Sequence, residues 1–349
     1  MVPVVLPKWN DPRLKLTVVI VSLQVLGQTV LGFKVSITQI LLTILACAVV
    51  EIVITYFRQG ALIWPASALL TGNSVAFILR TPGTRHGDWW SLNGIEYFIG
   101  AALLGLLSKY LITIGGRHLY NPSNLGLVAV FLVAGAAHVF PQYLWWGELQ
   151  PPVVGALAVI LIGGLWVLWP LRMLAMVGAF LVTFGILVGL LAEGGSCFNA
   201  AWSPTAVCGS DYWLNICLSP ELLVFVFFMI SDPRTAPESS PGRLIYGAAV
   251  AAAAAALIAT QPSEYGVKVA LLAALAVVCS VVPLIDRIAA RRFSLAIPAG
   301  LRLGQAAIVV LAALIVIVAV PPATVRLASD PLVLASDGNP SLGVKPSQP

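Results

Sequence analysis

Charged side chains are scarce in this chain. Asp, Glu, Lys and Arg make up 9% of its 349 residues, whereas an average soluble domain devotes about a quarter of its residues to charge. Acidic residues are the rarer sign, with 14 against 19 basic residues, and hydrophobic residues reach 59%. So few charges cannot cover the surface of a water-soluble protein of this length, which excludes the soluble protein classes.

The common sequence signatures of soluble catalysis are also missing. The chain has no Gly-Lys-Ser/Thr phosphate loop, no Gly-x-Ser-x-Gly elbow and no complete dinucleotide fingerprint, so a soluble-type ATPase, hydrolase or dehydrogenase has no support. The histidines His86, His118 and His138 are scattered, and no Cys or Glu recurs beside them at metal-ligand spacing. We therefore expect no zinc or haem site.

The sequence does contain a series of long apolar runs. Most of them extend for about 18 to 23 residues, the length of a helix that crosses roughly 30 Å of hydrocarbon, and a helix satisfies its own backbone in lipid. This pattern predicts an all-α polytopic protein of the lipid bilayer with about ten or eleven transmembrane helices. The predicted spans are Leu14–Leu31, Val35–Phe57, Ala61–Leu79, Gly94–Ile114, Asn121–Phe140, Pro151–Trp169, Leu171–Leu191, Pro220–Ile230, Leu244–Thr260, Val267–Leu284 and Ala306–Val320.

The distribution of basic residues predicts the orientation, because Lys and Arg collect on the cytoplasmic side of a membrane. Most of the 19 Lys and Arg residues fall on the same side as the N-terminus, among them Arg58, Lys109 and Arg117. We expect a multi-pass protein of the bacterial inner (cytoplasmic) membrane with a cytoplasmic N-terminus and an uncleaved first helix. The same bias explains the net charge of +5, which therefore gives no support for a nucleic-acid partner.

The order of the spans suggests an internal repeat. The chain divides after about Pro141 into two sets of five spans, and an odd number of spans inverts the second set relative to the first. We predict two inverted five-helix repeats within a transmembrane domain of residues 1–290. Residues 291–349 would add one further helix and a disordered polar tail.

Three of the five cysteines fall in or beside the polar segment Glu193–Ser219. The charge count places this segment outside, where disulfides form. Cys197 and Cys208 are one pairing, but Cys217 could be the partner instead.

Two polar segments could carry chemistry. Gly115–Asn124 precedes an apolar span, and there Asn121 can cap the helix, Pro122 suits its first position, and Arg117 with the helix dipole favours an anion. A capped turn and a phosphate or flavin contact are both open. Asp232–Gly242 contains three prolines and cannot be helical throughout, which leaves an ordinary loop or a ligand-lining segment.

Glu51 is the acidic residue placed deepest in a predicted span. A charge there costs about 2.5 kcal/mol or more unless it is paired or hydrated. It is a candidate for an ion path, or it could snorkel and pair with Arg58. Glu96, Lys109 and Glu221 lie nearer the predicted span ends and are weaker candidates.

Four motifs in the same order resemble the RnfD/NqrB membrane-subunit family, which comprises the RnfD component of Rnf complexes and the NqrB component of the Na+-translocating NADH:quinone reductase. The resemblance covers about residues 14–287 and is closest to the branch of enediyne biosynthesis membrane proteins. The motifs are TGNSVAFILRTPG from Thr71, GGRHLYNPSNLGLV from Gly115, ISDPRTAPESSPGRLIYG from Ile230 and VPLIDR from Val282.

The resemblance implies an electron-transferring subunit of an ion-coupled oxidoreductase, not a complete enzyme, with other membrane redox subunits as partners. Family members commonly attach one flavin mononucleotide to a Thr in a Ser-Gly-Ala-Thr pattern. Here Thr205 follows Ser203-Pro204, so we expect noncovalent FMN or riboflavin and no covalent flavin. The resemblance carries over the cofactor-binding candidates Asn73, Arg117, Asn121, Asp232, Arg234 and Thr235.

Three functions are compatible with such a scaffold, because a fold does not determine a function. The first is a membrane subunit of a redox-linked electron-transport system. The others are a small-molecule or ion transporter or channel, with a polar path past Glu51, Asn73 and Asn121, and an accessory membrane protein of a biosynthetic gene cluster.

Overall fold

Helices form nearly all of the regular structure in the computed structural model, which describes residues 3–8, 11–144 and 151–292. The helices are α1 (Pro12–Thr29), α2 (Ile37–Gln59), α3 (Ala66–Ile78), α4 (Ile95–Leu111), α5 (Pro122–Ala134), α6 (Pro151–Leu171), α7 (Leu174–Glu193), α8 (Gly209–Cys217), α9 (Pro220–Val224), the π-helical turn η1 (Phe225–Met229), α10 (Ser240–Ile258), α11 (Glu264–Cys279) and α12 (Val282–Arg292).

Eight two-residue strands pair in the connections between helices. They are β1 (Val4–Val5), β2 (Leu62–Ile63), β3 (Leu79–Arg80), β4 (Thr113–Ile114), β5 (Arg117–His118), β6 (Phe140–Pro141), β7 (Cys197–Phe198) and β8 (Val207–Cys208). β1 pairs with β2 in parallel, whereas β3–β6, β4–β5 and β7–β8 are antiparallel. The fold is therefore the all-α polytopic membrane protein predicted above.

Helices occupy the first ten predicted spans, but their lengths differ. Within the described residues, five segments are long and apolar enough to cross a membrane, and α11 with α12 makes a sixth if that bent pair is one span. Helices α3 and α5 have only 13 residues each, or about 20 Å at 1.5 Å per residue. The predicted spans Ala61–Leu79 and Asn121–Phe140 were thus too long. The span Ala306–Val320 and the polar tail lie outside the described residues.

The polar segment Glu193–Ser219 is only partly a loop, contrary to the sequence prediction. Helix α8 occupies its second half, and residues Gly209–Met229 together form one of the five long apolar segments. The sequence did not predict this helix because Asp211, Asn215 and neighbouring small residues interrupt its apolar pattern. Its buried side chains are Tyr212 and Ile216.

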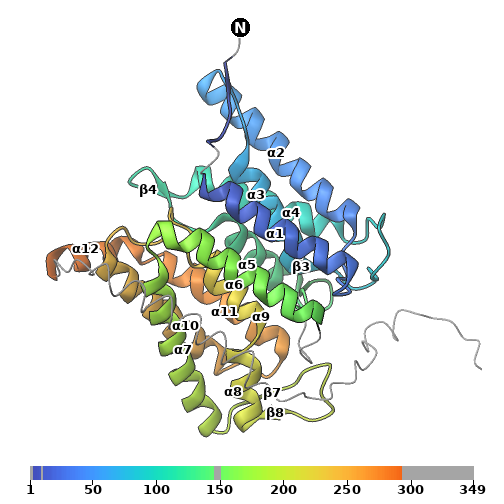
Figure 1. The fold of residues 1–349 in the computed structure, drawn as a ribbon, viewed down its shortest axis with the longest axis vertical. Helices are drawn as coiled ribbons and strands as arrows, with labels where there is room; N and C mark the ends of the chain where they lie inside the picture. Colours follow the sequence, from blue (N-terminus) through green and yellow to red (C-terminus); the bar gives the residue numbers. More distant parts are fainter. Residues whose placement is uncertain (1–2, 9–10, 145–150, 293–349) are drawn as a thin grey trace, which may run out of the picture.

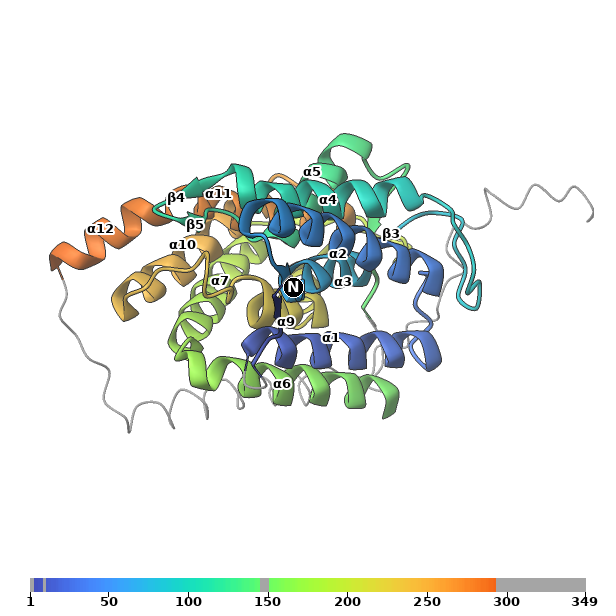
Figure 2. The ribbon, with the colours of Figure 1, turned by 90° about the horizontal axis from the view of Figure 1, so that it is seen from above.

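The order of the helix contacts agrees with an inverted repeat. In the first five helices α2 packs on α4, and α4 packs on α5; in the second set α7 packs on α10, and α10 packs on α11. The two sets meet through corresponding members, α1 with α6 and α5 with α11. Figure 1 shows α2 and α3 in the upper part of the molecule and α7, α8 and α10 in the lower part, while α1 and α6 lie side by side in Figure 2.

Corresponding helices run antiparallel, as inversion requires. Asn124 Nδ2 in α5 donates to the Leu272 carbonyl oxygen (3.0 Å), and the Tyr265 hydroxyl in α11 donates to the Phe131 carbonyl oxygen (2.6 Å). Residue numbers therefore increase along α5 in the direction in which they decrease along α11, so these two helices are antiparallel. The pair α1–α6 has the same sense, because Lys15 lies over Trp166 whereas Val19 lies against Gly163.

Close helix approach depends on glycine at the α4–α5 contact. A Cβ added at Gly105 would collide with the Pro122 carbonyl oxygen, and one added at Gly126 would collide with the Ala101 carbonyl oxygen. In lipid, small residues at helix contacts allow the close packing that drives helices together.

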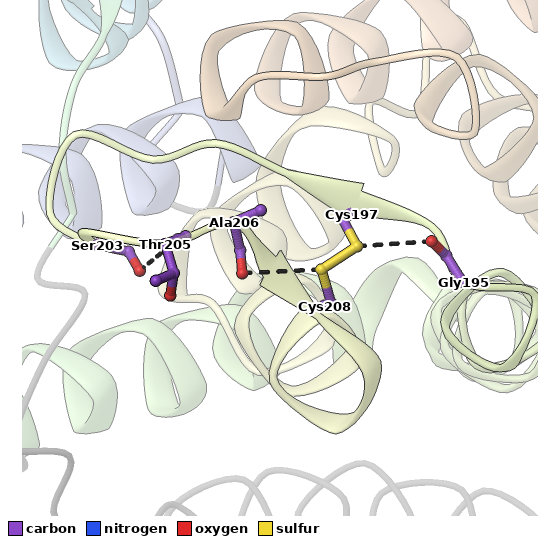
Figure 3. The surroundings of a disulfide bond; sticks show 6 residues. All are labelled: Gly195, Cys197, Ser203, Thr205, Ala206 and Cys208. Atoms are coloured by element: carbon purple, nitrogen blue, oxygen red, sulfur yellow. Dashed lines mark hydrogen bonds between the residues drawn. A yellow bond between two sulfur atoms is a disulfide. The ribbon is translucent and has the colours of Figure 1, made fainter.

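The connection between α7 and α8 is closed by a disulfide. Cys197 and Cys208 are bonded across the β7–β8 pair (Figure 3), and Cys217 is a free, half-buried cysteine. Of the two alternatives left open by the sequence, the structure contains the Cys197–Cys208 pairing.

Removing this disulfide should lower stability. The sequence separation of its cysteines is 11 residues, and closing a loop of that length contributes about 3 kcal/mol in the chain-entropy description. Cys208→Ser, or dithiothreitol treatment of the wild-type protein, should lower the thermal unfolding temperature in detergent. Cys217→Ser is the matched control and should keep the full dithiothreitol effect; an unfolding temperature insensitive to dithiothreitol would contradict the structural role.

Candidate functional site

Arg117 joins the two halves of the protein. It lies in β5, on the turn before α5, and its guanidinium reaches the segment between η1 and α10. Nε donates to the Arg234 carbonyl oxygen (3.1 Å), and Nη2 donates to the carbonyl oxygens of Pro233 (3.2 Å) and Ala236 (2.8 Å). Nη1 pairs with the Glu238 carboxylate at 2.7 Å. We call this set of contacts between Arg117 and residues 233–238 the Arg117 clamp.

Asp232 shapes the clamped segment from within. Its Oδ1 accepts from the Arg234 backbone N–H (2.9 Å), and its carbonyl oxygen accepts from the Thr235 and Ala236 N–H groups (3.1 and 2.9 Å). Its Oδ2 lies 3.5 Å from His118 Nε2. The buried Thr235 hydroxyl also donates to the Asp232 carbonyl oxygen (3.3 Å). The segment is therefore a self-bonded turn, and three of its carbonyls accept hydrogen bonds from Arg117.

Asn121 links the start of α5 to the end of η1. Its Oδ1 accepts from the Asn124 N–H (3.2 Å), so it caps α5 as the sequence predicted, with Pro122 at the first helical position. Its Nδ2 donates to the Met229 carbonyl oxygen (3.1 Å). The π-helical turn η1 ends at this residue, and such turns occur frequently at functional sites.

Arg234 also influences the N-terminus of α1. The Asp11 side chain accepts hydrogen bonds from the Arg13 side chain and backbone, and the charges of Arg13 and Arg234 add attraction. Together these interactions hold the pKa of Asp11 below its usual value, against the opposing effect of partial burial. The clamped segment thus lies within electrostatic reach of α1.

The structure brings together five of the six cofactor-binding candidates: Arg117, Asn121, Asp232, Arg234 and Thr235. Asn73 lies apart from these contacts, in α3, where it is 2% exposed. Its backbone oxygen is 3.5 Å from Gln24 Nε2, but neither its amide oxygen nor its amide nitrogen has a hydrogen-bond partner among the described residues. A buried amide without partners costs roughly 1–3 kcal/mol.

Glu51 is not paired with Arg58. Its Oε1 lies 2.7 Å from Lys109 Nζ, which also donates to the Ser67 hydroxyl (3.2 Å), while Arg58 lies over the Tyr110 ring. The pairing hypothesis named the wrong cation because Lys109 comes from α4, far away in the sequence. The role of Glu51 in an ion path stays a prediction.

Thr205 lies in the exposed turn between β7 and β8. Its carbonyl oxygen accepts from the Ser203 hydroxyl (2.7 Å), as Figure 3 shows. Pro204, directly before Thr205, favours this local turn. The flavin attachment pattern has no proline at that position. The prediction that this threonine carries no covalent flavin is not tested by this geometry.

Sequence reasoning missed a second buried polar group, which we call the Lys268 cluster: Lys268, Glu221, Glu264, Arg80 and Tyr143. Lys268 Nζ lies 3.0 Å from Glu221 Oε1 and 2.9 Å from Glu264 Oε1. Lys268 Nζ and Arg80 Cζ both lie over the Tyr143 ring, at 4.6 and 4.0 Å from its centroid. The spacing of Glu264 and Lys268, one turn apart at the start of α11, was the available signal.

The two polar groups lie at opposite ends of α11. The Lys268 cluster lies near the first residues of this helix, whereas the Glu238 N–H donates to Asp286 Oδ1 (3.3 Å) beyond its last residue. In the part of the chain that the structure describes, an ionic assembly thus lies near each end of α11, and each joins the first half of the sequence to the second.

Arg117→Ala should release the segment of residues 233–238. The change removes a charged donor from three carbonyls and the Glu238 carboxylate, and hydrogen bonds to charged groups contribute roughly 1.5–3 kcal/mol each. Hydrogen exchange of the amides in this segment should accelerate at least tenfold, and overall unfolding should change less. Arg58→Ala removes a basic residue outside the clamp and should leave this exchange unchanged; equal exchange in all three proteins would contradict the clamp.

Lys268→Met should destabilise the protein strongly, because it leaves the Glu221 and Glu264 carboxylates buried without their cation. Breaking such a buried pair costs about 3–5 kcal/mol. Thermal unfolding in detergent should show a large loss, and exposed Lys8→Met should show none. Adding Glu221→Gln and Glu264→Gln should restore much of the stability; no recovery would mean that packing, and not charge pairing, is the contribution of Lys268.

Comparison with known proteins gives a family match over part of the chain. Residues 144–294 match the model of the NQR2, RnfD, RnfE family, a range that contains two of the four sequence motifs, η1 and the clamped segment. No curated protein sequence matches the chain. The closer resemblance to the enediyne branch stays a prediction. Over residues 144–294 this multi-pass membrane protein is similar to the NQR2, RnfD, RnfE family.

Proposed function

We propose that the chain is a membrane subunit of a redox-linked, ion-coupled electron-transport system, assembled with other membrane redox subunits, and that it binds FMN or riboflavin noncovalently. The single observation that carries this proposal is the family match over residues 144–294. A membrane subunit of a redox complex is the role that this family implies. The ion coupling, the flavin and the partner subunits are the further steps of the proposal.

The residues present fit one part of a flavin better than another. Asn73 offers a buried amide donor and a buried amide acceptor without protein partners, and the edge of an isoalloxazine ring alternates N–H and carbonyl groups. Arg117 lies in β5, shortly before the N-terminus of α5, but its donors already contact the clamped segment. This distribution supports ring recognition at Asn73 and gives no support for a phosphate at Arg117.

A bound flavin would supply one- and two-electron transfer. The chain's own contribution would be to bind the ring edge through Asn73, which is 2% exposed, and to exclude water from it. The Arg117 clamp would act at a distance from the ring by fixing the end of η1 relative to α5, since Asn121 bonds to Met229 there.

The test is an absorbance and fluorescence spectrum of detergent-purified protein, repeated on the supernatant and pellet after acid denaturation. Flavin in the supernatant is the expected result. Asn73→Leu should abolish it, because an apolar side chain cannot pair with the ring edge, whereas Asn215→Leu in α8 should retain it. Purification under mild conditions should also recover the partner redox subunits.

Three outcomes would change this proposal. Flavin that remains in the pellet would support electron transfer but would contradict noncovalent binding. Flavin in the supernatant that persists in Asn73→Leu would reject Asn73 as its contact. No flavin in either fraction, under conditions that retain it in a known relative, would reject the flavin and favour transport or scaffolding.

A further inference from the structure

Helix α6 presents an apolar surface at the outside of the protein. It is one of the segments of the described chain that are individually long and apolar enough to cross a membrane. Figure 2 shows it beside α1 at one edge of the molecule. The exposed residues of α6 are all apolar: Pro151, Val154, Ile162, Trp166, Trp169 and Pro170. No exposed polar residue therefore interrupts this surface along the helix.

Two tryptophans lie at the end of this apolar surface. Trp166 and Trp169 are each 47% exposed, and both belong to the last two turns of α6. Tryptophan is enriched where a membrane span meets water, because its ring is apolar and its indole N–H is polar. The last turns of α6 therefore lie at the level of the lipid headgroups.

Lys15 and Arg172 bring positive charge to the same end of α6. Lys15 belongs to α1, and its Nζ lies 5.3 Å from the centroid of the Trp166 ring. Arg172 is exposed and directly follows the last residue of α6. Among the described residues, neither cation forms an ion pair with a carboxylate, whereas nearby Arg13 is paired with Asp11. Two positive charges are thus left without a protein counter-ion beside the tryptophans.

The backbone makes Arg172 an unusual residue for its position. Its φ is 56°, and no other residue except glycine has a positive φ in the described part of the chain. The Met173 N–H donates to the Leu168 carbonyl oxygen (3.4 Å), a hydrogen bond typical of helix ends at which glycine occupies the left-handed position. Arginine is strained in that conformation. Such strain points to a role for the arginine side chain.

A further arginine removes an obstacle to anion binding at this end. The last carbonyls of a helix carry partial negative charge, which disfavours an anion. Arg243 Nη1 donates to the carbonyl oxygens of Leu171 (3.0 Å) and Arg172 (3.3 Å), and its Nε donates to the Pro237 carbonyl oxygen (3.0 Å). The guanidinium of Arg243 therefore covers the end of α6 with positive charge.

We propose that the end of α6 binds an anionic phospholipid, with the phosphate paired to Lys15 and Arg172 and the acyl chains along Ile162, Trp166 and Trp169. The occupant is a lipid and not a soluble phosphate, because the two cations adjoin an uninterrupted apolar surface on a membrane span. It is anionic, because a zwitterionic headgroup supplies its own cation. This inference does not depend on the proposed redox function.

The first experiment titrates the purified protein in detergent with phosphatidylglycerol or phosphatidylcholine and follows its thermal unfolding temperature. Phosphatidylglycerol should raise this temperature more than phosphatidylcholine does. In the variant Lys15→Gln/Arg172→Gln, the phosphatidylglycerol concentration for half the shift should rise on the order of 25-fold, because each basic residue near an anionic surface contributes a factor of roughly five.

Two controls accompany this titration. Arg58→Gln/Arg287→Gln removes two exposed basic residues outside the site and should respond as the wild type does. Inorganic phosphate alone should give no comparable shift. A wild-type titration in Lys15→Gln/Arg172→Gln, or a phosphate shift equal to that of phosphatidylglycerol, would overturn the lipid assignment.

The variant Arg172→Gly separates lipid binding from folding. Without added lipid it should unfold at a higher temperature than the wild type, because glycine adopts the left-handed conformation without strain. Phosphatidylglycerol should nevertheless raise its unfolding temperature less than it raises that of the wild type. A glycine variant that keeps the full phosphatidylglycerol response would reject Arg172 as a lipid contact.

A second measurement does not depend on unfolding. The photo-cross-linking residue p-benzoylphenylalanine replaces Trp169 in one full-length protein and Ile186 in another, each reconstituted in vesicles of equal phosphatidylglycerol and phosphatidylcholine content. Ile186 is exposed on α7 between the exposed apolar residues Val182 and Leu190, so it reports contact with lipid chains away from the two cations.

Mass spectrometry should detect a higher ratio of phosphatidylglycerol to phosphatidylcholine adducts at position 169 than at position 186. Adding Lys15→Gln/Arg172→Gln should abolish this excess. Equal ratios at the two positions, or cross-links from position 169 to protein alone, would show that the end of α6 has no site for an anionic lipid.

Discussion

The absence of hydrogen-bond partners in the lipid interior is the constraint on which the rest of this structure depends. A charge or amide in a span is costly unless it has a partner inside the protein. Glu51 finds Lys109, and Lys268 lies between two carboxylates. The Glu51–Lys109 and Lys268–Glu221 contacts join helices that are distant in the sequence, whereas Glu264 and Lys268 lie one turn apart in α11. Pairing of buried polar groups therefore also determines which helices lie together.

The short helices follow from the same constraint. A 13-residue helix leaves free backbone groups at membrane depth, and irregular backbone is tolerated there only where protein encloses it. The end of α3 is enclosed by the β3–β6 pair, where the Gln142 N–H donates to the Ile78 carbonyl oxygen (2.6 Å). The end of η1 is enclosed by α5, where Asn121 donates to Met229. The end of η1 is thus covered by the other half of the chain, whereas the end of α3 pairs with β6 at the end of its own half.

The sequence predicted the features that are local. The apolar runs predicted the positions of ten helices, because the length of a hydrophobic stretch indicates whether it can cross the bilayer as a helix. Asn121 and Pro122 predicted the start of α5, because a helix cap involves residues only three positions apart. Five of the candidates fall in two motifs, Arg117 and Asn121 in the first and three residues of Asp232–Thr235 in the second. They lie together in the structure, although the motifs are more than 100 positions apart in the sequence.

Contacts between distant segments could not be predicted from one sequence. Nothing in the residues around Glu51 identifies Lys109 as its partner, since that pairing exists only when α2 packs on α4. The Lys268 cluster is similar, because its five members come from four separate segments. Helix α8 was not predicted for another reason. Its apolar residues alternate with polar and small ones, so its buried face is evident only when neighbouring helices are in place.

Arg117 and Asn73 differ in whether their polar side-chain atoms are already paired. Arg117 donates to three carbonyls and a carboxylate, so binding an anion there would first require breaking those contacts. Asn73 has neither amide atom paired among the described residues, and a ligand that pairs with both would recover the cost of their burial. A ligand could therefore gain hydrogen bonds at Asn73 without breaking existing ones, whereas at Arg117 it would have to replace existing contacts. In the proposed function, ligand recognition would therefore fall to the short helix α3, whereas the contacts of Arg117 join the two halves.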